Sequence, residues 1–210
     1  MNWDQVFLTF GALIVSLTLH EAMHAWVAMM FGDLTAYRTG QVTLNPIPHI
    51  RREPFGMLLL PLISLMASNG TSCLGFAHAP YDPVWAARNP RKAAVMSAAG
   101  PFGNLLLAAI AFGALAVVGV YRHYDTATAA QVMAFEFLYI NLLLAVFNLI
   151  PLPPLDGAGV VRGLWPASGR WLDAFGALPF SFVIVFLLAS TVLGEGMTPI
   201  LRWVLELLPR

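Results

Sequence analysis

His20, Glu21 and His24 form an HExxH pattern inside an apolar stretch over residues 6–31. Residues i and i+4 of a helix lie on one face, so both imidazoles can offer a nitrogen to the same metal ion. Glu21 would then lie beside a metal-bound water and act as its general base. The pattern predicts a hydrolytic metal centre with His20 and His24 as metal ligands and Glu21 as the catalytic residue. A polar helix face that lines a channel or contacts another helix is the alternative.

Two histidines leave a catalytic zinc site incomplete, because such sites have three protein ligands and an open position for water. Asp156 is the preferred third ligand. It follows an apolar segment, and the prolines and glycine of residues 151–157 would unwind that helix end and expose a carboxylate at membrane depth. An ordinary loop turn leaving the bilayer is the alternative for this run. The other candidate ligands are Glu136, His49, His78 and His123.

The composition is that of a polytopic membrane protein. Of 210 residues, 59% are hydrophobic and 10% are charged, whereas soluble domains average about 25% charged residues. At about 20 residues per span, this length accommodates one bundle of four to six transmembrane helices and a single domain over residues 1–210. The zero net charge gives no indication of a nucleic-acid partner. The lone Cys73 excludes an internal disulfide and a cysteine-type zinc cluster.

Apolar periodicity and turn signals predict an all-α bundle with one short strand region after the first core helix. The three-helix catalytic core is expected at about 5–31, 93–120 and 131–157. Residues 56–68 are short for a span and contain Pro61, so a re-entrant or shallow element is expected there. Residues 39–45 alternate like a strand and end at Asn-Pro. A further span is expected at 174–193, with a separate amphipathic stretch near 197–208. The first residues lack a basic region and a cleavage site, so the first span is expected to remain in the mature protein.

Three motifs occur in a characteristic order: HExxH in the first core helix, Ala99-Gly-Pro-Phe-Gly-Asn104 opening a middle helix, and Asn148-x-x-Pro-x-x-Pro-Leu-Asp-Gly157 ending a third. In this order, which covers about residues 10–165, the chain resembles the site-2 protease family of intramembrane zinc metalloproteases. It is most similar to the compact subgroup without a PDZ domain. The loops that carry this likeness are Gly40-x-x-Thr-Leu-Asn-Pro46, Gly75-Phe-Ala-His-Ala-Pro80 and Arg88-Asn-Pro-Arg-Lys92.

The resemblance implies that His20, His24 and Asp156 bind one Zn²⁺ and that Glu21 activates water. It also implies that the segment around 39–45 pairs with an unfolded substrate. His78 stands where lysine is expected and Ala158 where a second glycine is common, which would affect substrate handling. Two histidines and a carboxylate can also hold a non-haem iron, but the glutamate beside the first ligand favours zinc.

Other polar side chains in or beside the spans are candidates for contact with substrate. Asn148, Asn104 and Asn141 could stabilise an oxyanion or hold a substrate backbone. For Asn104 and Asn141, hydrogen bonds between helices are an equal alternative. His78 is a candidate gate or substrate contact, with a solvated loop histidine as the simpler interpretation.

The expected substrate is a transmembrane protein segment that unwinds locally, because a fully hydrogen-bonded helix hides its carbonyl groups. A membrane metal-ion transporter or storage bundle is a rival function, and so is an inactive relative that only binds substrate. Against the transporter, only one cluster of ligands appears and Glu21 would be a competing fourth ligand, and the intact Glu21 argues against an inactive relative. Nothing in the sequence specifies an oligomeric state.

The distribution of basic residues predicts the orientation in the lipid bilayer. If Asp156 meets the histidines at one depth, the ends of the first and third core helices lie on one side of the membrane. That side then carries Arg38, Arg51, Arg52, Arg88, Arg91, Lys92, Arg162 and Arg170, against Arg122, Arg202 and Arg210 on the other. The positive-inside rule directs the active-site mouth toward the cytoplasm, and a bacterial inner membrane is the expected location.

Overall fold

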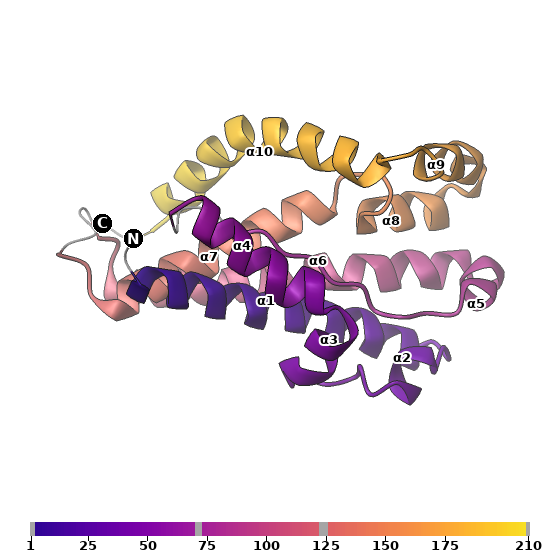
Figure 1. Ribbon diagram of the computed structural model, residues 1–210, viewed down its shortest axis with the longest axis horizontal. Helices are drawn as coiled ribbons and strands as arrows, with labels where there is room; N and C mark the ends of the chain where they lie inside the picture. The colour runs from indigo at the N-terminus through magenta and orange to yellow at the C-terminus, as the bar shows by residue number, and fades with distance from the viewer. Residues whose placement is uncertain (1–2, 70–72, 122–125, 209–210) are drawn as a thin grey trace.

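Three long helices lie side by side at the centre of the molecule (Figure 1). The structure is a computed structural model that describes residues 3–69, 73–121 and 126–208. The central helices are α1 (Trp3–Met30), α6 (Pro90–Val118) and α7 (Ala129–Asn148). Each is long and apolar enough to cross a membrane. They correspond to the predicted core helices, except that the third ends at Asn148 and not at 157, and the all-α membrane fold is confirmed.

Local signals explain where the central helices begin and end. Helix α7 starts with a capping box, in which Thr128 Oγ1 accepts a hydrogen bond from Gln131 N while the Gln131 side chain accepts one from Thr128 N. Helix α6 has Pro90 in its first turn, where a missing N–H costs nothing, and ends at Gly119 with a positive φ of 77°. These signals place the start of α7 and the two ends of α6 near the limits of the apolar runs.

Small side chains let the helices approach closely, as is common in membrane bundles. One buried cluster joins α6, α7 and the last helix, and consists of Ala108, Ala111, Leu115, Ala134, Leu138, Leu142 and Met197. A second joins α1, α7 and residue 57, and consists of Ala12, Leu13, Ile14, Leu17, Met57, Ile140 and Leu144. Together they fix the three central helices relative to one another.

The C-terminal region differs from the prediction. Residues 169–176 form a separate helix, α9 (Gly169–Gly176), and one continuous helix, α10 (Ser181–Glu206), follows it. The expected span at 174–193 and separate stretch near 197–208 are therefore wrong. Pro199 lies inside α10, and a proline is tolerated in a membrane helix where neighbours compensate. Met197 packs into the cluster with α6 and α7, which provides that support.

The predicted strand at 39–45 is also wrong, because these residues form turns and bends. Gly40 turns the chain with a φ of 71°. Gln41 Nε2 then donates to Pro48 O (3.2 Å), and His49 Nε2 lies 2.9 Å from Thr43 O. The segment thus folds onto the following helix, α3 (Pro46–Arg52), instead of pairing with another extended segment.

Residues 55–67 form a short apolar arm beside α1. It is one short helix that begins as a π-helical turn, η1 (Phe55–Leu59), and continues as α4 (Leu60–Ala67). At 1.5 Å per residue the two together rise about 20 Å, well short of the roughly 30 Å of a bilayer core. This length agrees with a shallow element rather than a crossing.

The remaining elements gather at one end of the bundle, where α1 and α7 finish and α6 begins (Figure 1). They are α2 (Thr35–Arg38), α3, α5 (Pro83–Arg88), α8 (Asp156–Leu164), η3 (Pro166–Ser168) and α9. The start of α1 and the last turns of α10 lie at the opposite end. We call the end with the short helices the site end, because it holds the side chains described next.

Candidate active site

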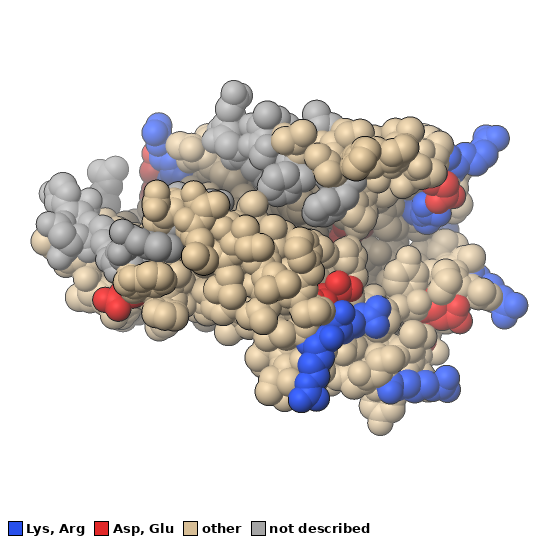
Figure 2. Space-filling view, in the orientation of Figure 1, with Lys and Arg blue, Asp and Glu red and all other residues tan. Residues whose placement is uncertain are grey.

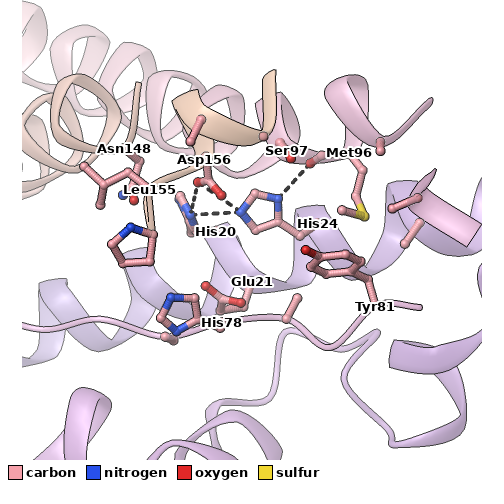
Figure 3. A pocket seen from close by; sticks show the side chains of 18 of the residues that line it. His20, Glu21, His24, His78, Tyr81, Met96, Ser97, Asn148, Leu155 and Asp156 are labelled. Atoms are coloured by element: carbon pink, nitrogen blue, oxygen red, sulfur yellow. Dashed lines mark hydrogen bonds and ion pairs between the residues drawn. The ribbon is translucent and has the colours of Figure 1, made fainter. Parts of the chain in front are cut away.

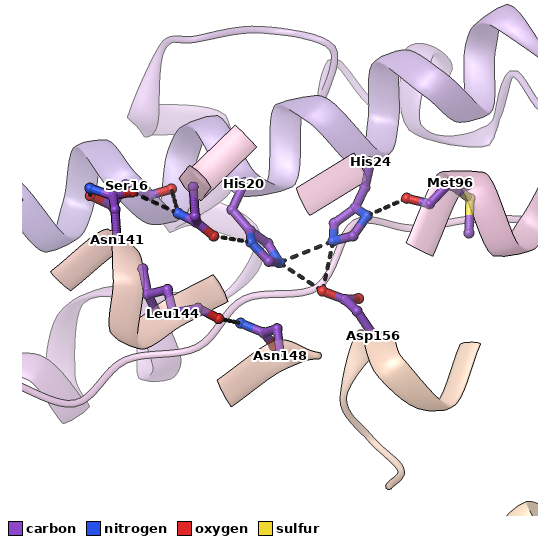
Figure 4. Close-up of polar contacts among 9 residues, drawn as sticks. Ser16, His20, His24, Met96, Asn141, Leu144, Asn148 and Asp156 are labelled. Carbon is purple, nitrogen blue, oxygen red and sulfur yellow. Dashed lines mark hydrogen bonds and ion pairs between the residues drawn. The ribbon is translucent and has the colours of Figure 1, made fainter. Parts of the chain in front are cut away.

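Three ligand atoms from two distant parts of the chain meet at the site end. His20 and His24 lie on the buried face of α1, with their Nε2 atoms 3.0 Å apart. Asp156 is the first residue of α8, and its Oδ2 lies 3.0 Å from His20 Nε2 and 3.2 Å from His24 Nε2 (Figure 4). The structure therefore brings together the two histidines and the carboxylate that the sequence singled out.

Hydrogen bonds on the far side of each ring fix which nitrogen carries the proton. His24 Nδ1 lies 2.7 Å from Met96 O, and a carbonyl only accepts, so Nδ1 is the donor. His20 Nδ1 lies 2.6 Å from Asn104 Oδ1. In the neutral tautomer, both Nε2 atoms then present a lone pair to Asp156. An acceptor behind each metal-binding histidine is the usual arrangement in metal sites.

Asn104 is itself oriented by a buried network. Its Nδ2 donates to Asn141 Oδ1 (2.9 Å) and to Ser16 O (3.4 Å), so its Oδ1 is the atom that faces His20. Asn141 Nδ2 in turn donates to Ser16 Oγ and to Phe137 O, both at 2.8 Å. Both asparagine side chains are fully buried between α1, α6 and α7. The network ends in backbone carbonyls, which leaves no freedom to reverse the direction of its hydrogen bonds.

The residues present fit a metal ion. Two lone pairs and a carboxylate oxygen face one another, and Asp156 Oδ2 has no hydrogen-bond partner among the described residues. Gly100 of α6 leaves the space that the rings need, because a Cβ there would lie 2.3 Å from His24 Nε2 and 2.6 Å from His20 Nε2. Two imidazoles and one carboxylate are a donor set that zinc accepts.

Glu21 lies beside these ligand atoms. It is 2% exposed, and neither carboxylate oxygen has a hydrogen-bond partner within the part of the chain that the structure describes. Ligand atoms of Glu21, His20 and His24 lie within 4.8 Å of one another. Burial of an unpaired carboxylate is costly, so this position is suited to a group whose partner is water or substrate.

A cavity of about 540 Å³ opens over this cluster (Figure 3). Its wall includes the histidines, Glu21 and Asp156, and also Asn148, His78 and Tyr81. Asn148 is held by a hydrogen bond from its Nδ2 to Leu144 O (2.9 Å). Asn148 and His78 are thus placed where substrate could contact them. Asn104 and Asn141 instead make the hydrogen bonds between helices that the sequence left as their alternative.

Among the other candidate ligands, His78 lines the cavity, whereas His49 and Glu136 do not. His49 is a buried residue of α3, and its Nε2 lies 2.9 Å from Thr43 O. Glu136 is on α7 and does not line the cavity. His123 lies outside the described residues.

Glycines fix α8, and hence Asp156, against its neighbours. A Cβ at Gly157 would lie 2.3 Å from Leu149 O, one at Gly159 would lie 2.3 Å from Ser97 Oγ, and one at Gly163 would lie 2.2 Å from Pro90 O. This close packing on α6 and on the end of α7 places the first turn of α8 over the histidines. Arg162 of α8 also pairs with Asp173 of α9, and this hydrogen bond lowers the pKa of the exposed Asp173 carboxyl.

Sequence reasoning missed several of these supporting residues. Ser16 stands one turn before His20 on the same face, so its i, i+4 spacing was an available signal. Gly100 lies in a motif that was noticed, but its contact with the rings is visible only in three dimensions. The Met96 carbonyl and the packing of Gly163 carry no sequence signal.

Comparison with known proteins agrees with this geometry. The sequence profile of peptidase family M50 matches residues 116–190. A Bacillus subtilis protein named "Putative zinc metalloprotease YwhC" is 39% identical over 189 residues, which are 87% of this chain and 80% of the relative. The chain belongs to peptidase family M50, the site-2 protease family. A Mycolicibacterium smegmatis protein named "Putative zinc metalloprotease Rip2" is 32% identical over 95% of this chain and 71% of its own length. The Rip2 of Mycobacterium tuberculosis strain H37Rv is 34% identical over 89% and 69%.

Family membership confirms the expected resemblance and makes the chain a metalloprotease of the membrane. The names of the relatives specify zinc, and the cluster of His20, Glu21 and His24 is compatible with it. No PDZ domain is present in residues 3–69, 73–121 and 126–208. No solved structure gives a significant match.

Proposed function

We propose that this chain is an intramembrane zinc endopeptidase that hydrolyses peptide bonds within or near transmembrane segments of protein substrates. One observation carries the proposal. Two Nε2 atoms and Asp156 Oδ2 meet within 3.2 Å, beside the unpaired Glu21 carboxylate, on a helix long and apolar enough to span a bilayer. Ionisable groups at such depth are normally retained for a function.

His20, His24 and Asp156 would hold the metal. Bound zinc would polarise the scissile carbonyl and lower the pKa of water toward 7. Glu21 accepts the proton from the attacking water and delivers it to the leaving amine. Its burial keeps competing hydrogen-bond donors away from the carboxylate, so the base remains available for this transfer. Asn148 and His78, on opposite sides of the cavity wall, are positioned to contact the substrate backbone.

The substrate follows from the location of the site. A peptide bond in an intact helix is shielded by its own hydrogen bonds and side chains, so cleavage requires a segment that unwinds locally. We expect a single-span membrane protein with helix-breaking residues to be cleaved. The active-site mouth would face the cytoplasm, because the basic residues of the site end belong on that side.

Metal content and cleavage together test the proposal. Purified wild-type protein should contain about one zinc per chain, as a mononuclear catalytic site requires, and His24→Ala and Asp156→Ala should lose it under identical preparation. Glu21→Gln should retain zinc but lose cleavage of a single-span reporter. Full zinc retention in Asp156→Ala would contradict the three-ligand site. Cleavage of extended soluble peptides but not of helix-broken spans would contradict the proposed substrate class.

The metal transporter remains the rival function to test. Transport would require zinc to exchange across a vesicle membrane, and Glu21→Gln would then change metal flux. If zinc stays bound to the wild type in vesicles and Glu21→Gln loses cleavage, the protein is a protease and not a transporter.

A further inference from the structure

Residues 73–82 cross the mouth of the cavity as an extended segment without helix or strand, and we call them the strap. Residues 75–81 of the strap all line the cavity. Figure 3 shows the strap passing the side of the cavity where Glu21 lies, with the His78 and Tyr81 side chains on it. The position of the strap therefore sets the width of the space above the catalytic cluster.

The first end of the strap is pinned to the short apolar arm. Leu74 N donates to Ser64 Oγ (2.9 Å), and Phe76 N donates to Gly56 O (3.1 Å). The contact at Gly56 is so close that a Cβ there would lie 2.2 Å from Phe76 O. Backbone and side chain together hold this end against η1 and α4.

The second end of the strap is pinned by one carboxylate. Asp33, which follows the end of α1, is 3% exposed. Its Oδ2 accepts a hydrogen bond from Asp82 N (2.8 Å), and its Oδ1 accepts two from Thr35, from the amide N (2.9 Å) and from Oγ1 (2.6 Å). Burial alone would raise the pKa of Asp33, but these hydrogen bonds and the charge of Arg38 hold it below its usual value. Asp33 is therefore an ionised acceptor, the strongest kind of hydrogen-bond partner for an amide.

Between these ends the strap is held less firmly. The Nε of the exposed Arg52 donates to His78 O over 3.3 Å, and an exposed contact of this length competes with water. Ala77 packs against the cluster of α1 and α7, and the cavity-lining residues from His78 to Tyr81 depend on the two pinned ends for their position.

We propose that Asp33 is a positioning residue of the active site, which holds the strap at the end of α1 and thereby shapes the groove that receives substrate. The inference rests on the proposed function for its kinetic part only. The metal ligands are held by α1, α6 and α8, not by the strap, so loss of the Asp33 contact should leave metal binding intact.

Asp33→Asn tests the hydrogen bond to Asp82 N separately from the two hydrogen bonds to Thr35. The asparagine Oδ1 can still accept from Thr35, but its amide NH₂ would face Asp82 N, so two donors would meet. Hydrogen exchange measured by mass spectrometry on the full-length protein in detergent should then show peptides that contain residues 77–82 exchanging about tenfold faster or more, since a hydrogen bond to a charged group changes an equilibrium by at least that factor. Ser64→Ala should raise exchange at the other end, around Leu74.

Two control variants keep their effects away from the strap. Asn45 is the N-cap of the neighbouring α3, and its Oδ1 accepts a hydrogen bond from Ile47 N. Asn45→Ala removes this hydrogen bond and changes no residue of the strap. Thr35→Val removes one hydrogen bond to Asp33 Oδ1 but leaves the Asp33 to Asp82 contact. Both should show wild-type exchange in residues 77–82.

The kinetic readout distinguishes positioning from general destabilisation. In Asp33→Asn, zinc content should equal that of the wild type, and KM for a single-span reporter should rise several-fold with a smaller change in kcat. Asp33→Glu, which keeps the charge, should recover part of the loss. Unchanged exchange in residues 77–82, or lost zinc, would overturn the proposal. If the wild type itself cleaves nothing, the proposed function fails, while the exchange experiment still decides whether Asp33 holds the strap.

Discussion

Hydrogen bonds behind the proposed metal ligands His20 and His24 determine which lone pairs these histidines present. Asn104 holds His20 Nδ1 and is itself held by Asn141 and Ser16. Its role in the structure is therefore to orient a ligand from within the helix bundle. Such partners typically contribute 10- to 100-fold to metal affinity.

Asn104→Leu tests this role with little change in volume. The substitution leaves His20 Nδ1 without its acceptor and Asn141 Oδ1 without its donor, so we expect zinc affinity to fall by about 10- to 100-fold, measured by competition with a chelator. Asn148→Leu is the matched control, because Asn148 lines the cavity but bonds only to Leu144 O of its own helix among the contacts described. It should keep wild-type zinc affinity. Equal affinity in both variants would remove Asn104 from the metal site.

Gly100 leaves room for the imidazole rings, and Gly100→Ala should exclude the metal. Its Cβ would lie closer than 3 Å to both Nε2 atoms, so the rings must move and the zinc content of the purified protein should drop sharply. Gly113→Ala, on the same helix with nothing within 4 Å of its Cβ, is the control. That change should retain zinc and stabilise α6 by up to about 1 kcal/mol. A fully zinc-loaded Gly100→Ala protein would show that the ring geometry is different from the one described.

At the scale of elements, the site depends on how α8 docks. Asp156 is placed by a short helix that packs through Gly159 and Gly163 on α6. The aspartate lies at the helix N-terminus, where the partial positive charge of the helix favours a carboxylate. The position of Asp156 thus depends on how α8 packs, and a change at the far end of α8 should alter zinc binding.

Gly163→Ala tests how the packing of α8 on α6 affects the position of Asp156. A Cβ there would lie 2.2 Å from Pro90 O, a backbone atom that cannot rotate away, so α8 must shift. We expect a destabilisation of about 1–3 kcal/mol, typical of overpacking, seen as a lower Tm in detergent, together with weaker zinc retention. Gly169→Ala, whose nearest atom is Arg162 Nη1 at 4.0 Å, should change neither quantity. Unchanged zinc binding with a lower Tm would separate the docking of α8 from the placement of Asp156.

The predictable parts of the structure are those encoded in local patterns. The i, i+4 spacing of His20 and His24 and the proline-rich end before Asp156 pointed to one site because each is a short-range signal. Residues 39–45 alternate like a strand, yet contacts with α3 fold them into turns. A span at 174–193 and a separate stretch near 197–208 are expected, yet packing around Met197 supports a continuous α10. Asp33 and Gly163 gave no signal at all, because their roles depend on segments that are distant in the sequence.

At the scale of the whole molecule, the unequal number of basic residues at its two ends predicts its orientation in the membrane. On the face shown in Figure 2, Lys and Arg side chains gather toward the end where α5, α8 and α9 lie. That end carries Arg38, Arg51, Arg52, Arg88, Arg91, Lys92, Arg162 and Arg170. Arg202, on α10, lies toward the opposite end. Because residues 55–67 are too short to cross, we expect the described segments between α1 and α6 to lie on one side of the membrane, so that these basic residues all lie on that side.

Single cysteines test the orientation without altering any basic residue. In a Cys73→Ser background, Ala167→Cys places a thiol in the exposed η3 turn at the site end, and Leu207→Cys places one in the exposed last turn at the opposite end. With right-side-out bacterial membrane vesicles, a membrane-impermeant maleimide should label Leu207→Cys directly but Ala167→Cys only after the vesicles are opened. The background protein without added cysteines should remain unlabelled in both conditions. The reverse pattern would place the cavity mouth outside the cell, so the positive-inside rule would have failed for this chain, and substrates would have to be sought on the external face. Labelling of both thiols from one side would instead require an even number of crossings between residues 167 and 207, which is incompatible with α10 running once from the site end to the opposite end.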